Sequence, residues 1–302
     1  MMTRIATFGL IATLAAAAAP APALASQTQP SAAPAAEPPA GEAGPAAAFD
    51  PSRSDEKAIQ IADQVIAAMG GARTWESTRF LKFTFLVRQG DKKLSVRTHH
   101  WDKAAQRSRM EGPTRDGKPM VAVVDHVSKQ GQASVDGQLL FEADAARYVD
   151  MAYKNLINDS YWLFMPFKLK DPGVRLRYEG EVKAGPVTYD RIVVTFQDGT
   201  GLTSKDRYTL YVNRKDHMIE RWSYVLEGQG ASASPTAWQW VDWTTVGGLK
   251  VSTRRTQDGG EVDIVLEDVQ IFDTLPDTVF TSASPVGGPG ETPPAAETPV
   301  IP

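Results

Sequence analysis

The fold of this chain is decided by the stretch RYTLYVNRKDHMIERWSYVL, residues 207–226. Two runs rich in aromatic and aliphatic residues, 207–212 and 218–226, flank the polar segment 213–216. Aromatic and β-branched residues favour strands, and a short polar segment between two such runs predicts a tight turn. Residues 207–226 therefore predict two neighbouring antiparallel strands.

Further strand-like runs lie on both sides of this pair. In residues 81–87, for example, Leu81, Phe83, Phe85 and Val87 alternate with other residues, which is the period of a strand. The remaining runs are 94–100, 106–111, 120–127, 174–182, 187–197, 237–245, 249–256 and 262–272. Turn residues such as Asp136-Gly137 and Gly247-Gly248 separate them. The pattern predicts a curved, incomplete antiparallel β-barrel of about eleven strands.

Two main helices complete the predicted mainly β (α+β) fold. Apolar residues recur at helical spacing in 59–69, before Gly70-Gly71, and again in 141–164. Residues 158–160 are weakly helical, and Pro166 ends the second helix. Two helices cannot fill the concave side of so large a sheet, so we expect them to close a hydrophobic cavity.

The second predicted helix runs into an uncharged segment, YWLFMPF at residues 161–167. An amphipathic helix needs only one apolar face, but this segment is apolar all round. It is therefore either central core or the lining of a cavity, and the residues leave both possibilities open. The hypothesis of a ligand site assigns the cavity wall or its helical lid to Tyr161, Trp162, Phe164, Met165 and Phe167.

The beginning of the chain has the features of a signal peptide, residues 1–25. Arg4 gives a basic start, residues 8–19 are apolar, and Ala23-Leu24-Ala25 is a small-x-small cleavage site. The apolar stretch is shorter than the ~20 residues of a membrane-spanning helix. We therefore expect cleavage after about Ala25, a soluble periplasmic protein, and no integral membrane segment.

Composition divides the rest of the chain into three parts. Residues 26–52 and 282–302 are rich in Ala and Pro, which predicts a disordered linker and a disordered tail around one β domain at 53–281. The chain has no cysteine, so it has neither disulfides nor a lipid-anchoring cysteine. The β domain contains 31 basic and 31 acidic residues, without the basic excess of a nucleic-acid binder.

The reactive side chains give no sign of an active site. His99 and His100 are neighbours on a predicted strand and point to opposite faces, so they cannot easily bind one metal, and we expect them to be solvated. No nucleophile elbow, phosphate-binding loop or metal-binding motif is present in the sequence. We expect no catalytic residue, no metal and no cofactor, and we predict that the protein is not an enzyme.

Three segments resemble the outer-membrane lipoprotein-sorting (LolA/LolB-like) superfamily. They are the strand pair RYTLYVN and MIERW (207–213, 218–222), the ending EDVQIFDTLPDTVF (267–280), and NDSYWLFMPFKL (158–169) with MGGARTW (69–75), which resembles an uncharacterised branch. The resemblance implies a half-open barrel whose helices close a hydrophobic cavity, which carrier members use for acyl chains.

The leading hypothesis is thus a monomeric periplasmic carrier or binding protein for a lipid, an acyl chain or another hydrophobic ligand. The alternative is a non-enzymatic interaction module of the cell envelope, whose sheet recognises a protein partner and whose Pro-rich ends act as spacers.

Overall fold

The computed structural model describes residues 48–230 and 233–284. The predicted signal peptide lies outside the described residues, as do most of the linker 26–52 and most of the tail 282–302. These three assignments stay predictions. The described part begins shortly before a short 3₁₀ helix, η2 (Pro51–Arg53), and ends after the helix α4 (Thr278–Thr281).

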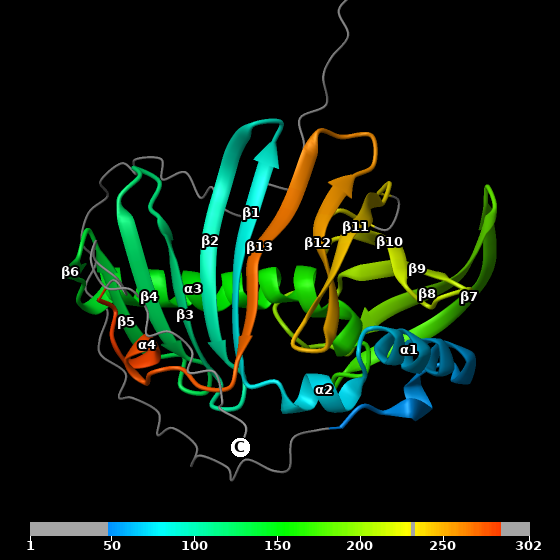
Figure 1. Cartoon of the computed structure of the whole chain (residues 1–302), viewed down its shortest axis with the longest axis horizontal. Coiled ribbons are helices and arrows are strands. Elements are labelled where there is room, and N and C mark those ends of the chain that lie inside the picture. The colour runs from blue at the N-terminus through cyan, green and yellow to red at the C-terminus, as the bar shows by residue number, and fades with distance from the viewer. Residues whose placement is uncertain (1–47, 231–232, 285–302) are drawn as a thin grey trace, which may run out of the picture. The chain divides into compact units, whose positions relative to one another are not determined.

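One antiparallel sheet of thirteen strands dominates the described part (Figure 1). Its strands are β1 (Phe80–Gln89), β2 (Lys92–Asp102), β3 (Arg107–Pro113), β4 (Pro119–Asp125), β5 (Gly131–Val135), β6 (Gln138–Leu139), β7 (Val174–Ala184), β8 (Val187–Phe196), β9 (Arg207–Asn213), β10 (Ile219–Val225), β11 (Thr236–Val246), β12 (Leu249–Gln257) and β13 (Val262–Phe272). The strand pair that opens the sequence argument is β9 and β10, with Trp222 opposite Leu210. The predicted open, curled antiparallel sheet is confirmed.

The order of strands shows how the chain builds this sheet. It runs β6-β5-β4-β3-β2-β1-β13-β12-β11-β10-β9-β8-β7, so the first and last strands pair at the centre. Phe85 of β1 lies opposite Leu266 of β13. The sheet contains two more strands than expected, because the short strands β5 and β6 flank the predicted Asp136-Gly137 turn. Both turn residues have positive φ, 54° and 75°, as a tight hairpin of this kind requires.

The long helix α3 (Glu142–Phe164) connects the two outermost strands, β6 and β7. Its 23 residues are about 34 Å long, enough to cross many strands. In Figure 1 it lies across the sheet, behind β2, β1 and β13. Its first half packs Val149 and Ala152 against β3, β4 and β5, where Met110, Ala122 and Ala133 are buried. The shorter helix η3 (Met165–Lys168) follows directly.

Two further helices precede the first strand. The first is α1 (Glu56–Ala68), whose buried residues Ala58, Ile61, Ala62, Val65 and Ile66 follow the predicted helical spacing. The second is α2 (Ala72–Ser77), a short helix that contains Trp75. Within the described residues, no helix combines the length and the apolar composition that a membrane crossing requires.

Candidate functional site

The predicted aromatic segment lies at the junction of α3 and η3, on the side that faces the sheet. Exposure is 8% for Trp162, 1% for Phe164, 0% for Met165 and 5% for Phe167. Tyr161 is only partly buried. The segment therefore lies inside the protein, and the identity of its neighbours shows what it does there.

Trp162 and Tyr161 pack on aromatic side chains of the C-terminal strands. The Trp162 ring meets Trp222 of β10 and Trp238 of β11 edge-on, at centroid distances of 4.7 and 5.1 Å. Tyr161 lies 5.3 Å from Tyr208 of β9 and 6.1 Å from Trp222. Because these residues come from three neighbouring strands, this half of the sheet presents a continuous aromatic surface to the end of α3. We call Tyr208, Trp222, Tyr224, Trp238 and Trp240 the aromatic wall.

Phe164 and Phe167 face a second group of rings. Both lie 5.1 Å from Trp75 of α2, and the Phe167 ring is stacked on it. Phe164 also meets Phe83 of β1 edge-on at 6.1 Å. The five predicted ligand residues thus lie in one segment, but their rings divide between the aromatic wall and the α2 side.

Burial of the tyrosine rings affects their ionisation. It raises the pKa of Tyr161, and the nearby carboxylates of Asp171 and Asp206 act in the same direction. Burial also raises the pKa of Tyr208 and of Tyr224. The phenols of this region therefore stay protonated at neutral pH, and the aromatic wall carries no charge.

Pro166 gives the end of α3 an unusual hydrogen-bonding requirement. In an α-helix the carbonyl of Trp162 accepts a hydrogen bond from the N–H of residue 166, and proline has none. Arg255 of β12 supplies the missing donor: its Nη2 donates to the Trp162 carbonyl oxygen at 2.7 Å. No pattern in the sequence pointed to Arg255.

Arg255 is completely buried and has an unusual set of neighbours. Its Nη1 donates to the carbonyl and the hydroxyl of Ser252, at 2.8 and 2.5 Å. The guanidinium carbon lies 3.7 Å from the centroid of the Trp240 ring. Among the described residues, no carboxylate lies within ion-pairing distance of it. Burial without a counter-charge lowers the pKa of Arg255.

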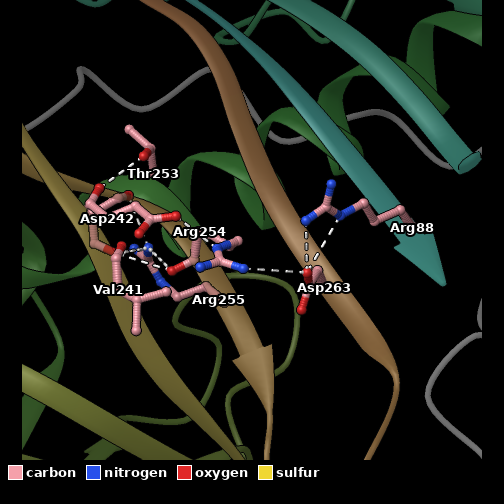
Figure 2. A network of polar contacts seen from close by, with 8 residues as sticks. Arg88, Val241, Asp242, Thr253, Arg254, Arg255 and Asp263 are labelled. Atoms are coloured by element: carbon pink, nitrogen blue, oxygen red, sulfur yellow. Dashed lines mark hydrogen bonds and ion pairs between the residues drawn. The ribbon is translucent and has the colours of Figure 1, made fainter. Parts of the chain in front are cut away.

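The adjacent arginine on the same strand behaves in the opposite way. Figure 2 shows Arg254 between two carboxylates, Asp242 at 2.7 Å and Asp263 at 3.9 Å, and Asp263 also accepts from Arg88 at 2.9 Å. These side chains are partly exposed and form an ordinary surface ion network. Of these two arginines, only Arg255 points into the aromatic interior.

The interior contains several N–H groups without acceptors. Within the described residues, Arg255 Nε, Trp240 Nε1 and Trp222 Nε1 are buried and make no hydrogen bond. Trp222 and Trp240 are neighbours, with ring centroids 5.4 Å apart, and Arg255 lies on the face of Trp240. Buried polar groups normally find partners, so these three donors make a polar spot within an otherwise apolar aromatic cluster.

A second buried polar group holds the C-terminal part of α3 on the sheet. Asp159 has no exposed surface and accepts from Arg97 Nε at 2.7 Å, Arg97 Nη2 at 2.9 Å and His99 Nε2 at 2.8 Å. Burial opposes ionisation of this carboxyl, but the charge of Arg97 and the hydrogen bond from His99 outweigh it and lower its pKa. The carboxylate therefore joins α3 to β2 by three charge-assisted contacts.

Two expectations from the sequence are wrong around Asp159. His99 and His100 were predicted to be solvated, but His99 is completely buried and bonded to Asp159, and His100 is largely buried on the other face of β2. Residues 158–160 were predicted to be weakly helical, but Asp159 and Ser160 lie buried inside continuous helix. One feature of the sequence hinted at both corrections: Asp159 is an acidic residue on the apolar face of α3.

Two hollows of the described surface lie elsewhere. One of ≈460 Å³ is lined by the turns at 186–188 and 213–215, and one of ≈340 Å³ lies between α2 and the end of β13. Neither contains any of the five predicted ligand residues. Within residues 48–230 and 233–284, no three His, Asp or Glu side chains are grouped so that they could hold a metal ion.

Residues 141–236 match a family of unknown function, DUF6503, and no curated protein matches the chain. A DUF1329 family protein from Desulfovibrio piger is 10% identical, with 75% of this chain and 98% of that chain covered and a TM-score of 0.43. A LolA superfamily protein from Nitrosomonas europaea is 12% identical, with 74% and 97% covered and a TM-score of 0.43.

Proposed function

We propose that this protein is a non-catalytic periplasmic carrier or binding protein for a lipid, an acyl chain or another hydrophobic ligand. The observation that carries the proposal is the aromatic wall, which faces the end of α3. Two buried N–H donors of the wall, on Trp222 and Trp240, and the Nε of Arg255 beside it make no hydrogen bond to the described residues. An amphipathic ligand at this wall would bring both apolar surface and hydrogen-bond acceptors for these donors.

The ligand would lie against Tyr161, Trp162, Phe164, Met165 and Phe167, which would form the cavity wall or its helical lid. These side chains belong to the last turn of α3 and to η3. An acyl chain buried between them and the aromatic wall would gain about 0.8 kcal/mol for each CH₂ group removed from water. Several methylene groups are therefore sufficient for useful affinity.

The proposal is tested by native mass spectrometry and lipid extraction of the protein purified from its own host. We expect a bound lipid in stoichiometric amount, and displacement of it by a fluorescent fatty acid. Trp162→Phe should weaken binding while the protein stays folded, whereas Phe141→Ala, at a site that is 76% exposed, should leave binding unchanged. Lipid-free protein that binds no fluorescent fatty acid would overturn the proposal.

A non-enzymatic interaction module of the cell envelope is the second candidate, and one observation favours it. Phe164 and Met165 are already almost completely buried by the protein itself, so the aromatic segment can be explained as core. This candidate predicts that an affinity purification from the host recovers one stoichiometric protein partner and no lipid.

A further inference from the structure

Lys103, which directly follows β2, occupies an unusual position. Its Nζ lies 4.1 Å from the centroid of the Trp75 ring, and it donates to the Trp75 carbonyl oxygen. The side chain is only partly exposed. Among the ion pairs of the described residues, none includes Lys103, although most other half-buried cations have a carboxylate partner.

A second lysine lies over the neighbouring indole ring, that of Trp101. Lys168 of η3 lies with its Nζ 5.7 Å from the centroid of Trp101, and Trp101 meets Trp75 edge-on at 6.2 Å. The two ammonium groups therefore lie over two contacting indole rings. We call Lys103, Lys168, Trp75 and Trp101 the lysine rim. It lies at the end of the strands where α2 is placed (Figure 1).

The carboxylates around the rim do not compensate the positive charge of Lys103. Burial lowers its pKa to about 8, and the charge of Lys168 acts in the same direction, against the weaker opposing effects of Glu76 and Asp171. Asp171 lies 3.5 Å from Lys168 rather than next to Lys103. An anion between the two ammonium groups would relieve both the repulsion and the loss of hydration.

The rim is continuous with the aromatic segment of the proposed ligand site. Phe167 is stacked on Trp75 at 5.1 Å, with an angle of 13° between the rings, and Phe164 lies 5.1 Å from the same indole. A ligand with its charged end at Lys103 and Lys168 would thus have its apolar part beside Trp75, next to residues that already belong to the site.

We propose that Lys103 and Lys168 bind the anionic headgroup of an amphiphile, a phosphate or a carboxylate, while its chain follows Trp75 toward the aromatic wall. This inference rests on the proposed function and adds the charge of the ligand to it. Two ammonium groups suit an anion with at least two oxygen atoms, and indole faces suit the first methylene groups of a chain.

Binding of three probes tests the inference: dodecyl phosphate, dodecanol and inorganic phosphate, each titrated calorimetrically below the micellar concentration. We expect dodecyl phosphate to bind at least about tenfold more tightly than dodecanol, and inorganic phosphate to bind far more weakly than either. Lys103→Gln and Lys168→Gln should each remove most of the preference for the phosphate and leave the affinity for dodecanol unchanged. Lys170→Gln is the matched control, because Lys170 is paired with Asp63 at 2.8 Å.

A second measurement follows Lys103 itself. Its pKa, measured by NMR, should rise above about 8 when dodecyl phosphate is bound and stay unchanged with dodecanol. Equal affinity for the two amphiphiles, or equal loss of both in the lysine variants, overturns the inference and leaves the carrier proposal standing. Inorganic phosphate that binds as tightly as dodecyl phosphate also overturns it, because the site would then recognise a free anion. Absence of binding by any amphiphile refutes the carrier proposal as well.

Discussion

Arg255 donates a hydrogen bond from Nη2 to the main-chain carbonyl of Trp162, 93 residues earlier in the chain. The bond joins the last turn of α3 to the interior of the sheet. It exists because Pro166 cannot supply the N–H that this carbonyl would otherwise receive. A proline in one segment and a buried arginine in another are therefore energetically linked.

A double-mutant cycle measures this link. Arg255→Met should leave the Trp162 carbonyl without a donor, and Pro166→Ala should give it one from its own helix. We expect Pro166→Ala to reduce the effect of Arg255→Met on the free energy of unfolding by about 1 kcal/mol, the usual contribution of one hydrogen bond. Urea unfolding of the four proteins gives this value. Strictly additive effects would show that the two residues are independent.

Asp159 should be among the most sensitive positions of α3. Asp159→Asn removes the charge that Arg97 and His99 face in the interior, and breaking a buried pair in this way costs about 3–5 kcal/mol. Asp150→Asn on the same helix is the control, because Asp150 and its partner Lys154 are more than half exposed. Its effect should stay below about 0.5 kcal/mol. Equal effects of the two substitutions in urea unfolding would contradict the assignment of Asp159 as a buried anchor.

Much of the fold could be predicted from the sequence, because it depends on local periodicity. Alternation of apolar residues indicated the strands, and apolar residues at helical spacing indicated α1 and α3. The short strands β5 and β6 lack enough residues for such a pattern. The central pairing of β1 with β13 is also not predictable from periodicity, since its partners, such as Phe85 and Leu266, are far apart in the chain.

The polar part of the interior could not be predicted, and the reason is physical. A histidine or arginine on a strand is normally solvated, and only a partner from elsewhere makes its burial tolerable. The partner of His99 is Asp159, 60 residues away, and that of Arg255 is the carbonyl of Trp162. The aromatic segment was predicted to be buried for a local reason, its uniform apolar character. Whether it also meets a ligand stays a prediction.

His100 should make stability depend on pH. Burial lowers its pKa from 6.5 to about 4, with smaller contributions from the charges of Lys82, Arg109 and His99. Between these values the unfolded chain binds a proton that the folded protein does not, so stability falls as the pH falls from about 6.5 to about 4. The contribution is at most about 3 kcal/mol. The free energy of unfolding of His100→Asn should lack this part of the pH dependence. If it differs from that of the wild-type protein by the same amount at pH 7 and at pH 4.5, the prediction is wrong.

The C-terminal strap, α4 together with residues 282–284, packs on the outer face of the sheet. Phe280 stacks on Phe80 at 6.0 Å, and Ala283 packs with buried Val121 and Val123. Arg109 of β3 is completely buried beneath it. Its Nη1 and Nη2 donate to the carbonyl oxygens of Ser282 and Ser284, both at 2.7 Å.

Arg109→Met should release the strap without unfolding the sheet. The substitution leaves the carbonyls of Ser282 and Ser284 without donors, and they regain partners in water only if the strap lifts from the surface. We expect amide hydrogen exchange in residues 279–284 to become at least about tenfold faster, which corresponds to about 1.4 kcal/mol of local stability, while α3 exchanges as before. Arg115→Met, in an exposed loop, is the control. If the strap exchanges equally slowly in both variants, the apolar contacts of Phe280 and Ala283 hold it and Arg109 does not.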